Sequence, residues 1–280
     1  MNKEIVMVIF SKNRALQLDL CLNSFYNRCV DSSYLNIKVI YTYDELHKQS
    51  YKILQAEHPS VEFIKENNFK QDLLNSINEY YHILFCVDDT IFTQDFILKN
   101  KVVYALNNLP PALGFSLRLG TNTKYCYPLD KYQEIPHSFS TNKSGILFYS
   151  WNNAQYDFAY PLEVSSSVYR TQDIYPILSG GDYSNPNQLE ALLDYNSMVF
   201  REIRPFMLYY HQSVAFSNPV NKIQTVAPLN RVGNNKLYES DILLEKYING
   251  YRIDPDKFYG FVSNGCHILV DLFNKENNYK

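Results

Sequence analysis

Two adjacent carboxylates end an apolar run in the stretch HILFCVDDTIF, residues 82–92. Asp88 and Asp89 follow the apolar residues 83–87, and apolar residues return at 91 and 92. Two explanations can account for two charges of the same sign side by side at the end of a buried strand. Either the pair is a solvated strand end or helix cap, or it binds a positively charged group such as a metal ion. Carboxylate oxygens suit Mg²⁺ and Mn²⁺, so the stretch is a candidate metal site.

The elements that would position these carboxylates follow from the hydrophobic pattern. Continuous apolar runs, typical of strands buried on both faces, alternate with segments of helical periodicity. This alternation predicts an α/β fold: a mostly parallel sheet with helices on both faces. The expected strands are 4–10, 37–44, 61–66, 82–89 and 112–120, and the expected helices are 14–28, 45–59, 68–81 and 95–111.

Polar clusters follow three of the predicted strands. The sequence SKNR follows the first strand, Asp44 ends the second, and Asp88 and Asp89 end the fourth. Ligands of such sheets bind beyond the carboxyl ends of the strands, so these side chains are expected to converge on one site. Asp44 has a second interpretation, as the cap of the helix that follows.

The pattern is less regular after about residue 120. We expect a long loop or irregular lid, then strand-like alternation, a helix behind an Asn cap, and a last core strand. The domain prediction is a main domain, residues 1–215, and a C-terminal extension, residues 216–280, packed on or over the site. The expected segments are 121–145, 146–178, 185–197 and 206–217.

Composition excludes several classes of protein. The 280 residues carry a formal net charge of −3 and are 46% hydrophobic, which favours a folded domain and argues against a nucleic-acid partner. The five cysteines form no CxxC pair, which disfavours a disulfide framework or a zinc site. The first apolar run is too short for a signal peptide or a membrane span. We therefore expect a cytoplasmic protein with at most peripheral contact with a membrane.

Several common catalytic motifs are missing from the sequence. There is no GxxxxGK[ST] phosphate loop, no GxGxxG after the first strand, no GxSxG elbow and no HExxH. The stretch VDDTIF echoes the aspartate phosphatases, but its spacing is wrong and it follows the fourth strand.

Taken together, residues 4–118 resemble the nucleotide-diphospho-sugar glycosyltransferases of the GT-A type, especially the family 2-like enzymes. The segment SKNRALQLDLCLNSF resembles their T-x-N-R…L…L-x-S-L opening. In those enzymes the second strand ends in an acidic residue, and Asp44 occupies the corresponding position here. The stretch CVDDTIF occupies the position of their D-x-D or D-D-D motif. The resemblance implies a GT-A-like, Rossmann-like fold.

The resemblance also implies an activity: transfer of a hexose from a UDP- or GDP-linked donor to a carbohydrate or glycolipid acceptor, as in bacterial polysaccharide synthesis. Mn²⁺ or Mg²⁺ would neutralise the diphosphate leaving group. The metal would be held by Asp89, with His267 as an added ligand and His211 as a weaker candidate. The residues implied for donor binding are Ser11, Lys12, Asn13, Arg14, Asp44 and Asp88.

In the resembled enzymes an inverting mechanism uses a carboxylate that deprotonates the acceptor hydroxyl. Glu190 is the best match, with Asp157 and Asp182 as rivals. Trp151 and Tyr156 are candidates for stacking on an acceptor sugar, since aromatic faces suit the CH faces of pyranoses.

Each of these residues also has a purely structural interpretation. Glu190 fits an exposed first turn of a helix, where the helix dipole favours an acid. His267 fits a core histidine, and the aromatic residues fit core packing.

A lid over the phosphates would bring Asn221, Gln224 and Arg231 to the donor.

One residue departs from the family pattern. Thr90 stands where the family has the last acid of D-x-D, and a hydroxyl is a weaker metal ligand than a carboxylate. Three alternatives to a metal-assisted enzyme therefore stay open: a site without metal, a catalytically inactive sugar-nucleotide or glycan binding protein, and a nucleotidyltransferase. The lack of a Gly-rich basic loop after the first strand disfavours the last.

Overall fold

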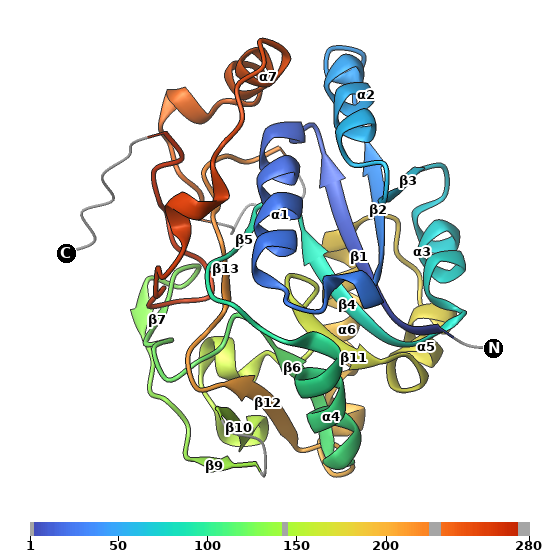
Figure 1. The fold of residues 1–280 in the computed structure, drawn as a ribbon. Coiled ribbons are helices and arrows are strands. Elements are labelled where there is room, and N and C mark those ends of the chain that lie inside the picture. Colours follow the sequence, from blue (N-terminus) through green and yellow to red (C-terminus); the bar gives the residue numbers. More distant parts are fainter. Residues whose placement is uncertain (1–2, 142–144, 224–230, 274–280) are drawn as a thin grey trace.

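A mixed sheet with helices on both faces forms the centre of the molecule (Figure 1). The computed structural model describes residues 3–141, 145–223 and 231–273. Within these residues the main sheet has nine strands in the order β3-β2-β1-β4-β11-β6-β12-β10-β9.

The first four strands of this sheet match the predicted ones and run parallel to one another. The antiparallel strand β11 lies between β4 and β6, and β5 and β13 pair outside the main sheet. The described strands are β1 Lys3–Lys12, β2 Asn36–Thr42, β3 Glu62–Lys65, β4 Tyr80–Val87, β5 Thr90–Phe92, β6 Ala112–Ser116, β7 Tyr125–Cys126, β8 Lys131–Tyr132, β9 Ser138–Ser140, β10 Ile146–Ser150, β11 Ser167–Arg170, β12 Phe206–Tyr210 and β13 Ala215–Ser217.

The helices divide between the two faces of the sheet. Helices α1, α2, α4 and α7 pack on one face, and α3, α5 and α6 pack on the other. The described α-helices are α1 Ala15–Arg28, α2 Lys48–Glu57, α3 Phe69–Ile77, α4 Tyr104–Asn108, α5 Thr171–Gly180, α6 Pro186–Asn196 and α7 Ser240–Ile248.

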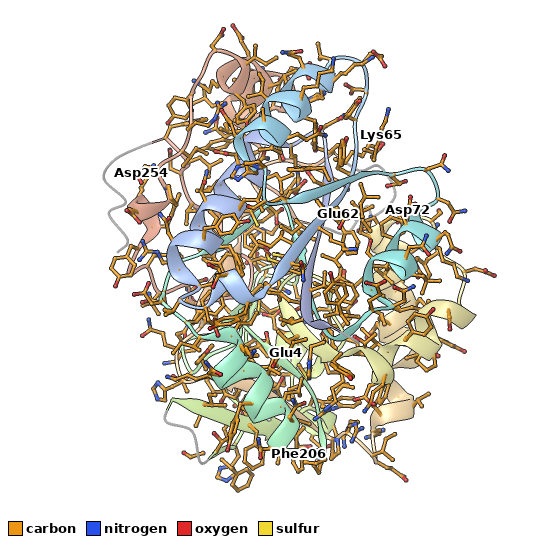
Figure 2. The ribbon with its side chains drawn as sticks, turned by 45° about the vertical axis from the view of Figure 1, so that its right-hand side comes forward. Glu4, Glu62, Lys65, Asp72, Phe206 and Asp254 are labelled. Carbon is orange, nitrogen blue, oxygen red and sulfur yellow. The ribbon has the colours of Figure 1, made fainter. Side chains whose placement is uncertain are left out.

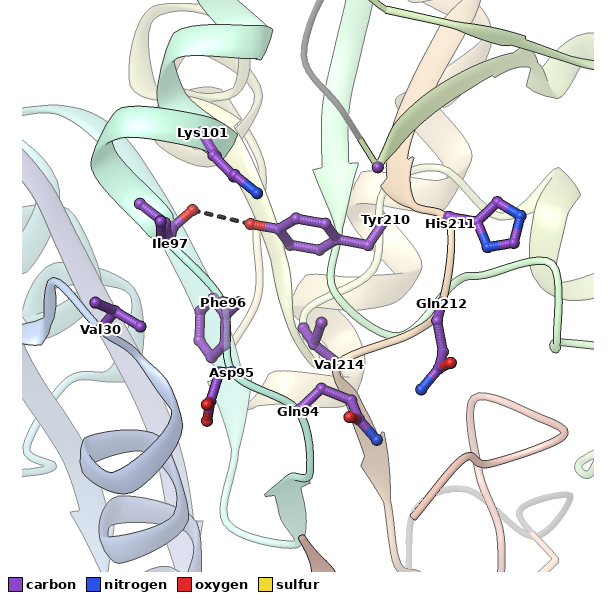
Figure 3. A pocket seen from close by; sticks show the side chains of 11 residues that line it. Val30, Gln94, Asp95, Phe96, Ile97, Lys101, Tyr210, His211, Gln212 and Val214 are labelled. Atoms are coloured by element: carbon purple, nitrogen blue, oxygen red, sulfur yellow. Dashed lines mark hydrogen bonds between the residues drawn. The ribbon is translucent and has the colours of Figure 1, made fainter. Parts of the chain in front are cut away.

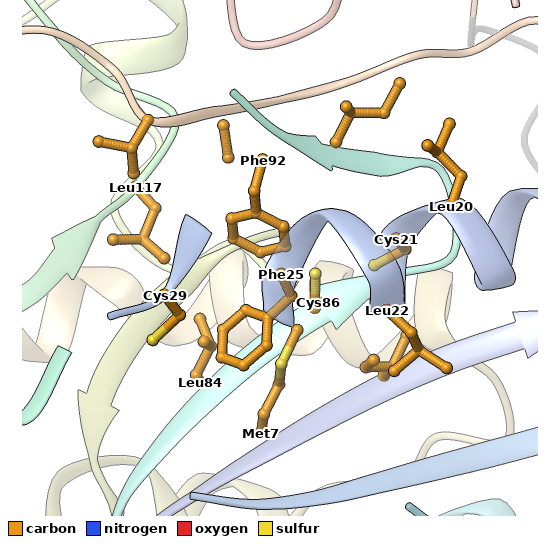
Figure 4. Packing of buried hydrophobic residues seen from close by; sticks show 14 of the residues in the cluster. Met7, Leu20, Cys21, Leu22, Phe25, Cys29, Leu84, Cys86, Phe92 and Leu117 are labelled. Atoms are coloured by element: carbon orange, nitrogen blue, oxygen red, sulfur yellow. The ribbon is translucent and has the colours of Figure 1, made fainter. Parts of the chain in front are cut away.

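Strand β1 shows why the apolar runs are continuous. Met7 and its alternate neighbours join the core under α1, whereas Val8 and its alternate neighbours join the core on the opposite face. Figure 4 shows Met7 packed with Leu84, Phe25 and Phe92, residues that contribute to the first of these cores. Full burial of a side chain such as Phe25 stabilises the fold by about 1.5–3 kcal/mol, so both faces of β1 must stay apolar.

One predicted helix is wrong at its start. The segment 95–111 begins with a π-helical turn, Leu98–Val103, and becomes α-helical only at Tyr104. The carboxylate of Asp31 accepts the backbone N–H groups of Leu98 and Lys99 at 2.7 and 2.8 Å. Local sequence could not show this cap because Asp31 comes from a distant part of the chain.

Strand β3 is an edge strand of the main sheet and carries charged side chains. Glu62 and Lys65 are exposed there (Figure 2). Such charges discourage pairing with another chain.

Candidate active site

A cavity of about 750 Å³ opens beyond the carboxyl ends of the parallel strands. The ends of β1 and β4 form one wall, and the start of α6 forms another. The cavity lies where open α/β sheets bind ligands. Its lining includes the following residues predicted from the sequence: Ser11, Lys12, Arg14, Asp88, Asp89, Tyr156, Asp157, Glu190 and His267.

The turn after β1 is shaped by Asn13. This residue has a φ of 52°, in the left-handed region that asparagine adopts more readily than most residues. Its side-chain N–H donates to Asp44 at 2.8 Å, and its side-chain oxygen accepts the N–H of Asp44 at 3.0 Å. Neither residue lines the cavity. Asp44 also contacts His47 at 2.8 Å and so holds the turn before α2.

The two carboxylates at the end of β4 bind a cation supplied by the protein itself. One guanidinium nitrogen of Arg14 lies 3.0 Å from Asp88 and 3.2 Å from Asp89. The carboxylate of Asp88 also accepts the backbone N–H of Lys12 at 3.3 Å. Burial raises the pKa of Asp88 to about 6, although the charge of Arg14 opposes this shift.

Thr90 faces away from this pair of carboxylates. Its hydroxyl is fully buried and donates to the backbone oxygen of Ser165 at 3.2 Å. Among the described residues, no group of three or more acidic, histidine or cysteine side chains could hold a metal ion. The expected set of Asp89 and His267 is therefore incomplete as it stands.

A buried network forms the floor of the cavity. Arg118 donates to Glu163 at 2.8 Å, to the hydroxyl of Ser217 at 3.1 Å and to Nε2 of His267 at 3.2 Å. Glu163 also accepts the backbone N–H of Ser165. Burial, reinforced by the charge of Arg118, lowers the pKa of His267 to about 3, so this ring is neutral at physiological pH.

Glu190 is presented to the cavity by the first turns of α6. Asn185 caps this helix as predicted, accepting the N–H of Gln188 at 3.0 Å. The Glu190 carboxylate accepts the backbone N–H of Val164 at 3.3 Å. Burial, and after it the nearby charge of Glu163, raises the pKa of Glu190 to about 7. A carboxylate with this pKa is suited to taking a proton near neutral pH.

The other predicted catalytic and acceptor residues lie in contrasting places. Asp157 lines the cavity, accepts from Gln133 at 2.9 Å, and has a pKa raised by burial. Tyr156 also lines the cavity. Trp151 lies in the core and donates to the backbone oxygen of Arg204 at 2.8 Å, outside the cavity lining. Asp182 is exposed and likewise outside the lining.

The C-terminal part of the chain contributes to the cavity. Its lining includes Asn221 and Arg231, two residues of the expected lid. The backbone oxygen of Asn221 accepts from Arg14 at 2.5 Å. Gln224 lies outside the described residues.

A smaller hollow of about 380 Å³ opens elsewhere, next to Tyr210 (Figure 3). The hydroxyl of Tyr210 donates there to the backbone oxygen of Ile97 at 2.9 Å. His211 lines this hollow and not the large cavity, which separates it from Asp89.

Arg118 and Glu163 were not among the site residues predicted from the sequence. The available signal was an arginine inside the apolar stretch GFSLRLG, because a buried arginine requires a carboxylate partner. The partner itself, 45 residues further along the chain, could be found only in the folded structure.

The sequence of the chain is similar to that of a known glycosyltransferase. The chain is 33% identical over 193 residues to the bifunctional glycosyltransferase pgtA of Dictyostelium discoideum, an alignment that covers 63% of this chain and 25% of pgtA. The chain thus spans about a quarter of the length of this curated relative. No known protein-family model matches the chain.

Solved structures agree with the fold. Residues 1–349 of S. aureus TarS, in complex with UDP-GlcNAc, align with 91% of this chain and 70% of that chain at a TM-score of 0.50 and 12% identity. The chain has a GT-A-type glycosyltransferase fold. The predicted fold class and the predicted resemblance are therefore confirmed, and the Dictyostelium relative supports the predicted transferase.

A further structure aligns more loosely with this GT-A-type chain. The mannosyltransferase PcManGT from Pyrobaculum calidifontis, in complex with GDP-Man and Mn²⁺, has a TM-score of 0.42 and 9% identity, with 74% of this chain and 54% of that chain covered. A likeness this weak says nothing about the ligands of this chain. No helix in the described part of the chain is long and apolar enough to cross a membrane.

Proposed function

We propose that the chain is a glycosyltransferase that moves a sugar from a nucleoside diphosphate to a hydroxyl group of a carbohydrate or glycolipid acceptor. One observation carries the proposal. A single cavity at the carboxyl edge of a GT-A-type sheet joins the polar strand ends with a carboxylate, Glu190, whose pKa is raised to about 7.

The proposed reaction uses the two ends of the cavity differently. At one end the turn 11–14 and the Asp88–Asp89 pair adjoin the nucleoside diphosphate. At the other end Glu190 accepts the proton of the acceptor hydroxyl as its oxygen attacks the anomeric carbon. The bond from that carbon to the diphosphate breaks, and the nucleoside diphosphate leaves with the electron pair. Attack from the side opposite the leaving group inverts the anomeric centre.

The resemblance also implies a divalent cation, Mn²⁺ or Mg²⁺, whose chemistry would be to neutralise the leaving diphosphate. Asp88 and Asp89 are the residues that would hold it. In the described structure both carboxylates contact Arg14, and no histidine, cysteine or further carboxylate joins them in a group that could hold a metal ion. The donor set does not fit the ion in this arrangement, and the proposed reaction uses no metal ion.

The test is turnover by a matched pair of Glu→Gln variants. Purified protein is incubated with UDP-GlcNAc, UDP-glucose or GDP-mannose and a panel of glycan acceptors, and release of UDP or GDP is measured. Glu190→Gln is expected to lower turnover at least about 100-fold, the usual range for loss of a general base, without loss of UDP or GDP binding. Glu202→Gln, the same change at an exposed residue outside the cavity lining, should keep near-normal turnover.

Two outcomes would contradict the proposal. Unchanged turnover in Glu190→Gln would remove this residue as the base and favour Asp157. Binding of UDP or GDP with no turnover of any donor would favour the alternative of a catalytically inactive sugar-nucleotide binding protein, which Thr90 suggested.

A further inference from the structure

We propose that Arg14 takes the place of a divalent cation in this cavity, so that the protein binds a nucleoside diphosphate without a metal ion. The inference rests on the proposed function, because it concerns the same donor end of the cavity. It answers the question raised by the two adjacent carboxylates, since the positive group that they bind is part of the chain.

The first support is the geometry of the pair. A single nitrogen of Arg14 lies 3.0 Å from Asp88 and 3.2 Å from Asp89. The side chains of the three residues are only 15%, 6% and 14% exposed, in that order. A cation bound by both carboxylates would have to displace a guanidinium that is largely shielded from water. Breaking a buried ion pair is costly because it leaves an uncompensated charge.

The second support is the anchoring of Arg14 on both sides. Its other terminal nitrogen donates to the backbone oxygen of Asn221 at 2.5 Å, and its backbone N–H donates to the hydroxyl of Tyr51 at 3.3 Å. Asn221 is itself held by Gln17 at 3.1 Å and by the backbone oxygen of Tyr238 at 2.7 Å. Tyr51 therefore holds the backbone of Arg14, and Asn221 holds its guanidinium, in addition to the contacts with the two carboxylates.

The third support is that the described residues provide no third histidine, cysteine or acidic ligand beside these two carboxylates. The hydroxyl of Thr90 is directed to the backbone oxygen of Ser165 and is fully buried. His267, the other expected ligand, is excluded by its tautomer. Arginine only donates, so Nε2 of His267 must accept from Arg118, and Nδ1 of the neutral ring must carry the proton. Neither nitrogen then has a lone pair for a metal while this contact lasts.

The charges of the cavity wall complete the argument. Without Arg14, two adjacent carboxylates would repel the diphosphate. With Arg14 in place, half of that negative charge is neutralised, and Lys12 and Lys222 in the same lining add positive charge. Phosphate oxygens are bound well by such charged donors without a metal ion.

The experiment separates Arg14 from a metal by titration. UDP and GDP are titrated calorimetrically in EDTA and again with Mn²⁺, and Mn²⁺ alone is titrated and followed by electron paramagnetic resonance. The wild-type protein should bind a nucleotide with a dissociation constant that differs less than about twofold between EDTA and Mn²⁺, and should not bind Mn²⁺ alone at micromolar concentrations.

Variants of Arg14 make the test specific. Arg14→Gln should weaken nucleotide binding in EDTA at least about tenfold, and Mn²⁺ should restore part of it, because the freed carboxylates can then hold the ion. Arg14→Lys should keep binding that is independent of metal. Arg28→Gln is the matched control, since Arg28 also joins two carboxylates, Asp95 and Asp256, away from the cavity. Circular dichroism confirms that each variant is folded.

The possible results differ for the two proposals. Nucleotide binding by the wild type that requires Mn²⁺ would overturn this inference and leave the proposed function standing. Unchanged binding in a folded Arg14→Gln variant would also overturn it. Failure of the wild type to bind UDP or GDP under either condition would overturn the proposed function, and this inference with it.

Discussion

Glu190 and Asp88 face the same cavity, yet their surroundings differ in kind. Asp88 has a cation beside it, which opposes the effect of burial on its pKa. Glu190 has a second carboxylate, Glu163, nearby, and Arg118 compensates only in part. Burial raises both pKa values, to about 6 for Asp88 and to about 7 for Glu190, so Asp88 beside its cation is the stronger acid of the two.

This residue-scale difference predicts how stability depends on pH. The folded-state pKa of Glu190 is about 7, above its ordinary value of 4.5, so the folded protein holds this proton more tightly than the unfolded chain. The contribution of Glu190 to the free energy of unfolding is therefore lost as pH rises from about 4.5 to 7. Glu190→Gln removes this loss. The variant should be more stable than the wild type at pH 8, by on the order of 1 kcal/mol or more, because one pKa unit is worth about 1.4 kcal/mol.

Urea unfolding of both proteins at pH 5 and pH 8 measures the effect. The difference in the free energy of unfolding should be largest at pH 8 and shrink at pH 5. Glu202→Gln is the control, since it makes the same change at an exposed side chain outside the cavity. A stability difference for Glu190→Gln that is equal at both pH values would show that Glu190 ionises normally in the folded state.

At the scale of elements, the N-terminus of α6 determines where Glu190 stands. The Asn185 side chain accepts the N–H of Gln188 at 3.0 Å and fixes the first turn of the helix. Helix α3 begins in the same way, with Asn68 accepting the N–H of Gln71 at 3.0 Å. The two caps are chemically alike, but only Asn185 lines the cavity and precedes Glu190 on its helix.

The pair of caps allows a controlled prediction. Asn185→Ala and Asn68→Ala should each lower the free energy of unfolding by about 1 kcal/mol, the usual cost of losing an N-cap. Only Asn185→Ala should also lower turnover, because a frayed first turn lets Glu190 leave its place against Val164. Urea unfolding and nucleotide release measure the two effects. An equal loss of turnover in both variants would show that general destabilisation is responsible.

Elements also set the limit of what the sequence could predict. Strands β1 to β4 and helices α1 to α3 have continuous apolar runs or clear helical periods, so their presence and their order along the chain were predictable. Strand β11 is only Ser167–Arg170 and inserts between β4 and β6 by long-range pairing, which no local pattern encodes.

The same distinction applies to the site. Strand ends pointed to Arg14, Asp88 and Asp89, because the carboxyl ends of parallel strands meet at one edge. Their arrangement as an ion pair could not be predicted, since a carboxylate pair beside a basic residue fits a metal site equally well on sequence alone. The Arg118–Glu163 contact depends on tertiary packing throughout.

At the scale of the whole molecule, the C-terminal segment shares a core with the first strands. The carboxylate of Glu57 on α2 accepts from the hydroxyl of Tyr247 at 2.8 Å and from Arg252 at 3.0 Å. Helix α7 lies beside α1 and α2 (Figure 1). Apolar residues from this segment that join the core of Ile9 and Leu16 include Val220, Leu243, Tyr247, Phe258, Val270 and Leu272.

A shared core predicts that this segment and the sheet unfold together. Native-state hydrogen exchange measures the free energy of opening for amides in α7 and in β1. The slowest amides of both elements should exchange through the same global opening, within about 1 kcal/mol, because cooperative units are contiguous in their packing. An α7 that opens at a far smaller free energy than β1 would instead mark residues 216–280 as a separate unit. In that case Asn221 would hold Arg14 only while this unit is docked, and nucleotide binding in EDTA should weaken under the mild urea concentrations that open α7.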